Sequence, residues 1–199
     1  MNNDALLNDL IGSRICHDLV NPLSAIGNGV ELLSMSGTGD SPELTLISES
    51  VGSATARIRF FRIAFGSSTP GSRIGNSELR SVLQDMFRCS RIQIDWQVTS
   101  DLPRTEAKLA SLLILCLESA LAWGGTISIQ RDDNERWALH ATGERLKYDE
   151  ALWHQLSGAD DEPSVTSSDV HFALCHGTAV RLDRAIVVQK SSHAIQISF

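Results

Sequence analysis

Two long amphipathic patterns in the first third of the chain constrain its fold more than any other feature. In the first, apolar residues recur at helical spacing, at Ile11, Ile15, Leu19, Leu23, Ile26, Val30 and Leu33. In the second, they recur as a strict heptad, at Leu44, Ile47, Val51, Ala54, Ile58, Phe61 and Phe65. Two such helices cannot enclose a core alone. The simplest completion is a second copy of the chain, which gives a dimeric four-helix bundle.

The segment between the two patterns predicts the turn of an antiparallel helical hairpin. It reads Ser36-Gly37-Thr38-Gly39-Asp40, a cluster of turn-forming residues. Ser41 is the expected N-cap of the second helix, with Pro42 at its first helical position. Gly66 and the flexible stretch SSTPGS end the hairpin, so the first domain is expected to cover residues 1–68.

The rest of the chain alternates short strand patterns with helical ones. We expect strands at 92–98, 126–130, 137–141, 185–189 and 194–199, and helices at 77–87, 106–123, 149–156 and 168–182. This mixture predicts a C-terminal α/β sandwich over residues 75–199, and the whole chain is therefore expected to be α+β.

Composition excludes several classes of function. A net charge of -7 and a pI near 5.3 argue against nucleic acid as a partner, because phosphate binding needs a basic surface. The sequence has no run of 18 apolar residues, so no membrane span is expected, and the acidic N-terminus does not resemble a signal peptide. The 4 cysteines lack C-x-x-C spacing and the 6 histidines lack metal-ligand spacing. We expect a cytoplasmic protein with reduced cysteines and no metal site.

The first helix carries the sequence His17-Asp18-Leu19-Val20-Asn21-Pro22-Leu23. Pro22 should kink the helix, and we interpret the kink as a point where it can bend and swing His17. A neutral imidazole is a nucleophile near neutral pH, and Asp18 could orient it or act as a general base. Asn21, one turn on, could position a water or a phosphoryl oxygen. Taken alone, each of these side chains also fits an ordinary solvated helix face.

This seven-residue motif resembles the H-box of sensor histidine kinases, His-Glu/Asp-Leu-x-Thr/Asn-Pro-Leu. The resemblance implies a phosphorylated histidine on a dimeric four-helix bundle, followed by an ATP-binding α/β domain. That second half departs from the kinase pattern. Leu115 and Ser119 stand where the kinases have two asparagines, although Glu118 could replace one as a magnesium ligand or be a simple helix acid. The Asp-x-Gly-x-Gly box reads Ala141-Thr142-Gly143-Glu144-Arg145, and the last glycine-rich box retains only Gly177.

Phosphate binding by such boxes needs bare backbone amides from successive glycines. We therefore expect no nucleotide, no bound cofactor and no autokinase activity. A phosphorylatable histidine beside a degenerate nucleotide domain resembles the ChpT-type histidine phosphotransferases of alphaproteobacteria, as does the opening RICHDLVNPLSAIGNGVELL.

The resemblance implies a phosphorelay. His17 would take a phosphoryl group from the receiver aspartate of a hybrid histidine kinase and pass it to the receivers of response regulators, which supply the Mg²⁺. An ATP-dependent sensor histidine kinase and a non-catalytic adaptor that only binds receivers are the alternatives.

Receivers must dock around His17. In an antiparallel hairpin, residues near 57–62 share its level, and the candidate docking residues are Arg14, Arg59, Phe60, Arg62 and Ile63. Phe60 and Ile63 lie nearly opposite the heptad, where they are either exposed for a receiver or covered by the C-terminal domain. Arg59 and Arg62 either meet an acidic receiver surface or are simply solvated.

Overall fold

The computed structural model describes residues 3–35, 42–69, 71–158 and 166–199. Within the first helix it describes the side chains of Gly12, Ile15, Cys16, residues 19–21 and residues from Leu23 onward. The chain divides into two compact units, one with residues up to Ser67 and Ser81–Cys89, the other with Ser68–Arg80 and Ser90–Phe199. The sequence places the boundary close to Ser67, but it assigns the whole of the third helix to the second domain.

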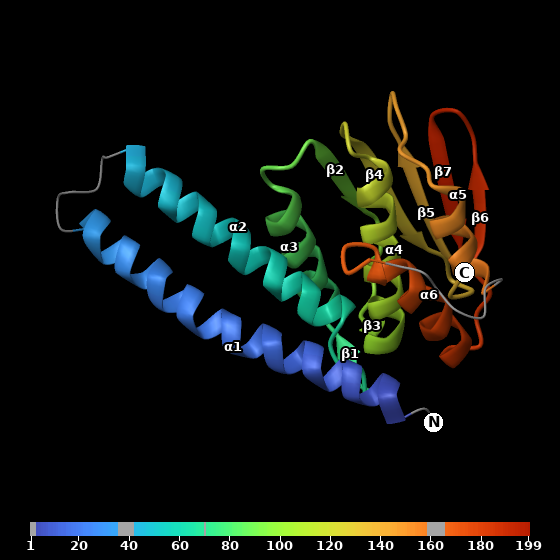
Figure 1. The fold of residues 1–199 in the computed structure, drawn as a ribbon, viewed down its shortest axis with the longest axis horizontal. Coiled ribbons are helices and arrows are strands. Elements are labelled where there is room, and N and C mark those ends of the chain that lie inside the picture. Colours follow the sequence, from blue (N-terminus) through green and yellow to red (C-terminus); the bar gives the residue numbers. More distant parts are fainter. Residues whose placement is uncertain (1–2, 36–41, 70, 159–165) are drawn as a thin grey trace. The chain divides into compact units, whose positions relative to one another are not determined.

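The first unit is built on helices α1 (Asn3–Leu33) and α2 (Pro42–Ala64), which lie side by side (Figure 1). Two glycines mark where they touch. A Cβ added to Gly12 would lie 3.0 Å from the carbonyl oxygen of Phe65, and one added to Gly27 would lie 3.5 Å from a methyl group of Val51. The expected turn and the N-cap Ser41 lie outside the described residues, whereas Pro42 does begin α2.

The apolar surface of α1 consists of two stripes instead of the one we predicted. The inner stripe packs on α2 and contains Gly12, Cys16, Val20, Leu23, Gly27 and Val30, at steps of about 3.6 residues. The outer stripe contains Ile15, Leu19, Ile26 and Leu33, which are 54%, 47%, 50% and 52% exposed. The sequence pattern combined residues of both stripes into one predicted stripe, because the two lie next to each other on the helix.

The opposite face of α2 is already covered within the chain. Phe60 and Ile63 are 0% and 4% exposed, so of the two alternatives for them, exposure to a receiver is wrong and coverage by the chain itself is correct. The second half of helix α3 (Asn76–Phe87) belongs to the same unit, and its Asp85 carboxylate lies 4.0 Å from the Arg59 guanidinium. The sequence pattern of the two hairpin helices does not indicate that a third helix belongs to the same unit.

The second unit is an α/β sandwich. Its strands are β2 (Ile92–Trp96), β4 (Gly125–Arg131), β5 (Trp137–Thr142), β6 (Val187–Lys190) and β7 (Ala194–Ser198), in the sheet order β2-β4-β5-β7-β6. The β2–β4 pair is parallel and the other pairs are antiparallel. Alternate side chains such as Ile127, Leu139 and Ile197 are fully buried, while Gln93, His140 and Gln196 are exposed.

Helices α4 (Arg104–Ala120) and α6 (Val170–Arg181) pack on each other, and α5 (Glu150–His154) leads into a short 3-10 turn, Gln155–Ser157. These elements match the predicted ones with small shifts at their ends, and the α+β class is confirmed. The short paired strands β1 (Arg73–Ile74) and β3 (Leu102–Pro103) were not predicted, because two residues cannot display a periodicity. Within the described residues, no helix is long and apolar enough to cross a membrane.

A buried carboxylate ties α4 to the sheet. Glu106, in the first turn of α4, accepts hydrogen bonds from Arg131 Nε at 3.0 Å and Trp137 Nε1 at 2.9 Å. Arg184 approaches its other oxygen at 3.9 Å. Because Trp137 is buried and the side chains of Glu106 and Arg131 are only 9% and 10% exposed, losing the acceptor would leave the Trp137 Nε1 and Arg131 Nε donors without this partner.

We expect Glu106→Ala to lower the free energy of unfolding by about 3–5 kcal/mol, the usual cost of breaking a buried ion pair. Glu135→Ala is the matched control, since Glu135 also binds Arg131, at 3.1 Å, but is 62% exposed. It should cost less than about 1 kcal/mol. Urea unfolding measures both values, and equal losses would contradict this role for Glu106.

Candidate functional site

The predicted phosphoacceptor lies in the middle of α1, which is helical without interruption through Pro22. The side chains of Arg14, His17, Asp18 and Pro22 lie outside the described residues, so their roles stay predictions. The helical backbone still fixes where they attach. An α-helix turns about 100° per residue, so the Cα of His17 lies about 100° around the axis from Cys16 on the inner stripe. Asn21 follows one turn later, and its side chain is exposed.

The contacts between the helices also fix the level of His17. Gly12 lies opposite Phe65 and Gly27 lies opposite Val51. Interpolating between these two contacts places His17 opposite Phe60 and Phe61. This agrees with the predicted level of residues 57–62.

The hairpin has two sides with different chemistry. Both helices are right-handed and they run in opposite directions. Starting from a residue in the α1–α2 contact, the next residue along either chain therefore turns toward the same side of the hairpin. Ile58 is the α2 residue that we take as facing α1. Around the helix axis, Arg59 lies about 100° and Arg62 about 40° from Ile58, in the same direction as His17 lies from Cys16. We call this the His17 side. The outer stripe, beginning at Ile15, lies on the other side, and we call that the apolar side.

The His17 side carries positive charge on α2. Arg62 is exposed, and the side chain of Arg59 is 48% exposed. Burial raises the pKa of the Cys16 thiol, and the positive charge of Arg62 partly offsets this by favouring the thiolate. Arg62 is therefore close to the residue that precedes His17. Of the predicted docking residues with described side chains, Arg59 and Arg62 are available at the surface, whereas Phe60 and Ile63 are not.

On the apolar side, the guanidinium of Arg57 lies 5.6 Å from the centre of the Phe61 ring, and Phe61 in turn packs edge-on against Phe65. Sequence reasoning did not single out Arg57. Its spacing of four residues from Phe61, on one face of a helix, was the available signal.

In the second unit, the positions that correspond to the kinase nucleotide boxes take part in the fold itself. Leu115 is 6% exposed, and the Ser119 hydroxyl donates to the Cys116 carbonyl at 2.8 Å. The Gly143 N–H donates to the His193 carbonyl at 3.0 Å. Among the described residues, no three His, Cys, Asp or Glu side chains come together as they would around a metal ion. The expectations about nucleotide and Mg²⁺ stay predictions.

Comparisons with known proteins identify related chains. A family model described as the histidine phosphotransferase C-terminal domain matches residues 76–194. The protein phosphotransferase ChpT of Brucella abortus (strain 2308) is 31% identical over 169 residues, which are 82% of this chain and 80% of that one. A solved structure described as a bacterial phosphotransferase is 26% identical, with a TM-score of 0.68 over 98% of this chain and 94% of its own. The histidine kinase domain of a blue-light activated kinase from Erythrobacter litoralis EL346 is 14% identical, with a TM-score of 0.47 over 94% of each chain.

The packing of Cys16 can be tested by thiol labelling. Cys89 is exposed, whereas Cys16, Cys116 and Cys175 are buried. Burial raises the pKa of Cys16 and of Cys116, so at pH 8 their thiols hold less of the reactive thiolate. We expect native protein treated with N-ethylmaleimide to be modified at Cys89 first, as mapped by mass spectrometry. Equally fast labelling of Cys16 would show that the inner stripe is open to solvent.

Proposed function

The chain belongs to the histidine phosphotransferase family, and on this premise we propose that His17 relays a phosphoryl group between receiver domains. The donor is the phosphorylated aspartate of a hybrid histidine kinase, and the acceptors are receiver aspartates of response regulators. The observation that carries the proposal is the H-box-like motif of α1, whose helix places His17 at the level of two exposed arginines, Arg59 and Arg62.

The chemistry needs few groups from this chain. One imidazole nitrogen of His17 attacks the phosphorus of the aspartyl phosphate, an N–P bond forms, and the P–O bond to the receiver breaks, which leaves a free carboxylate. The second nitrogen keeps its proton, and Asp18 stabilises the positive ring by accepting a hydrogen bond from it. The second transfer is the reverse of the first, onto another receiver. The receiver supplies Mg²⁺, so this chain contributes the nucleophile and its position.

The residues around His17 have separate tasks in this proposal. Asn21 lies one turn further along α1 and is exposed, so its amide can reach a phosphoryl oxygen or a water. Arg59 and Arg62 attract the acidic surface that surrounds a receiver's aspartate, and Arg14 would extend this positive charge along α1.

The apolar side supports a homodimer. Ile15, Leu19, Ile26 and Leu33 form an exposed apolar stripe, and Leu46 and Ile47 of α2 are also exposed, at 64% and 43%. A stripe of this length is unusual on a monomer and fits the core of a four-helix bundle made by two hairpins. Pairing through the apolar side would leave the His17 side of each copy open to a receiver.

The test is transfer of labelled phosphoryl groups from a phosphorylated receiver. We expect wild-type protein to become labelled, His17→Gln to stay unlabelled, and Asp18→Ala to be labelled about 10²–10⁴-fold more slowly, the usual range for a positioned acid–base group. His17 is expected to be the only labelled residue. Circular dichroism controls for folding.

Three outcomes would contradict the proposal. Label on folded His17→Gln would mean that the site is elsewhere. Binding of receivers without any label on wild type would favour an adaptor. Labelling of wild type from Mg-ATP alone would favour a kinase.

The dimer can be tested with one pair of matched variants in the full chain. Ile26→Asp places a charge on the exposed apolar stripe and should shift the protein to a monomer in sedimentation at micromolar concentration. Ser24→Asp places the same side chain on the His17 side, where Ser24 is exposed, and should leave the dimer intact. A monomeric wild type, or a dimeric Ile26→Asp variant, would contradict the proposed interface.

A further inference from the structure

We propose that the receiver-docking surface extends onto α3, along a polar stripe formed by Ser81, Gln84, Asp85 and Arg88. Asp85 moderates the positive charge of this surface. This inference rests on the proposed function, because it names a second part of the surface that the receiver contacts. It adds residues that lie outside the hairpin and its motif.

The geometry places this stripe at the level of His17, on the far side of α2 from α1. Arg59 lies within two residues of the level of His17, so it is within roughly 3 Å of it along the α2 axis. The Asp85 carboxylate lies 4.0 Å from the Arg59 guanidinium, which brings the second half of α3 to the same level. Arg59 is also on the His17 side, so the Asp85 end of α3 reaches that side of the hairpin.

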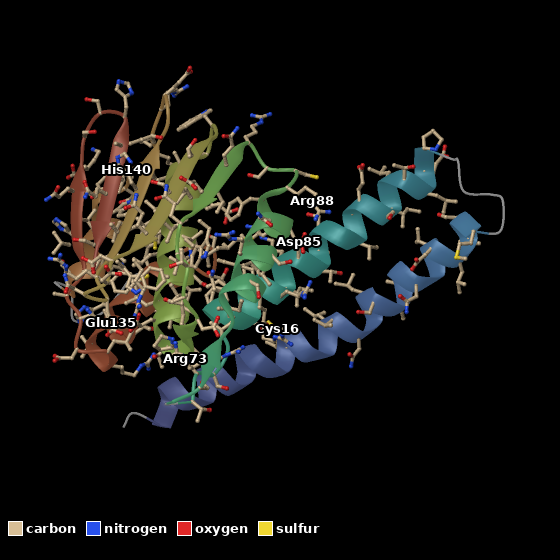
Figure 2. All side chains as sticks on the ribbon, turned by 180° about the vertical axis from the view of Figure 1, so that it is seen from behind. Cys16, Arg73, Asp85, Arg88, Glu135 and His140 are labelled. Atoms are coloured by element: carbon tan, nitrogen blue, oxygen red, sulfur yellow. The ribbon has the colours of Figure 1, made fainter. Side chains whose placement is uncertain are left out.

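The stripe is open to solvent. Its members follow one another at helical steps of 3, 1 and 3 residues, and Val82, Leu83 and Phe87 on the other face of α3 are buried. Asp85 and Arg88 lie next to each other near α2 (Figure 2). The Arg88 side chain is 73% exposed, so most of its surface is free to meet a partner.

The charges are arranged around one carboxylate. Asp85 contacts Arg88 directly and lies 4.0 Å from Arg59, while its own side chain is 28% exposed. Two guanidinium groups therefore share one acid, and the cluster stays positive. Asp85 offsets part of the charge of both arginines, so it competes with any carboxylate that a partner brings to them.

A receiver has the complementary chemistry. Its phosphorylation site must collect carboxylates, because it binds Mg²⁺ with oxygen ligands beside the reactive aspartate. Such a surface is attracted by Arg59, Arg62 and Arg88 as it approaches His17. Charges at the edge of an interface act mainly on the rate of association and on its dependence on salt. A relay must also release each receiver, and the negative charge of Asp85 favours release.

The experiment measures phosphotransfer from a phosphorylated receiver over a range of receiver concentrations. Arg88→Glu should raise the half-saturating receiver concentration roughly five- to twentyfold, since it reverses one exposed charge, and leave the rate at saturation unchanged. Asp85→Asn should lower that concentration roughly two- to fivefold by removing the competing acid. Both differences should shrink between about 50 and about 300 mM salt, because screening shortens the reach of exposed charges.

Arg136→Glu is the matched control. The Arg136 side chain is 70% exposed and also pairs with an aspartate, Asp132, at 2.8 Å, but it lies in the turn between β4 and β5. It should behave like wild type. Circular dichroism and urea unfolding verify that each variant is folded, and Arg88→Gln replaces Arg88→Glu if the reversed charge unfolds α3.

The outcomes separate this inference from the proposed function. If wild type transfers phosphoryl groups but Arg88→Glu matches Arg136→Glu, the docking surface ends at α2 and the inference is wrong. If Asp85→Asn has the saturation curve of wild type, Asp85 does not moderate docking and the inference is equally wrong. If wild type itself transfers nothing at any receiver concentration, the proposed function fails first.

Discussion

The close packing of α1 on α2 is the interaction on which the rest of the first unit depends. Gly12 and Gly27 let the two backbones approach, and Cys16 is buried on the same stripe between them in the sequence. At Gly12 even one added carbon would lie 3.0 Å from a backbone oxygen, so the level of the two helices is fixed there. That level sets which α2 residues surround His17. It also uses only the inner stripe of α1, which leaves one side of the hairpin apolar and the other polar.

The second unit is held together by buried contacts between its helices and its sheet. Helix α4 is buried along almost its whole length, and Glu106 fixes its first turn to Arg131 and Trp137. Where the kinase pattern has polar residues, this chain uses Leu115 in the core, and Ser119 bonds to its own helix. At these two positions the side chains serve the packing of the second unit.

Much of this organisation could be predicted from the sequence, because the elements have strong periodicities. The helices and strands from Asn76 onward occur where their apolar patterns place them, and Pro42 marks the start of α2. The failures concern what packs on a face. For Phe60 and Ile63 the sequence left two alternatives open, exposure to a receiver or coverage by the rest of the chain, because helical geometry treats a hairpin in isolation; the structure shows them buried, and α3 returns to the hairpin from a later part of the sequence. The two stripes of α1 were predicted as one for a similar reason. Apolar periodicity gives the spacing of residues, but it does not identify the surface on which each residue packs. Asp85 carries no sequence signal of its own, and only its distance from Arg59 connects it to the site.

The central claim is that one histidine of this chain carries the phosphoryl group during the relay. The most direct measurement is mass-spectrometric mapping of wild-type protein after brief mixing with a phosphorylated receiver, under alkaline conditions that preserve an N–P bond. We predict a single phosphorylated peptide, with the phosphoryl group on His17, which disappears when an unphosphorylated response-regulator receiver is added. A phosphoryl group on another residue, or one on His17 that no receiver can remove, would contradict the account.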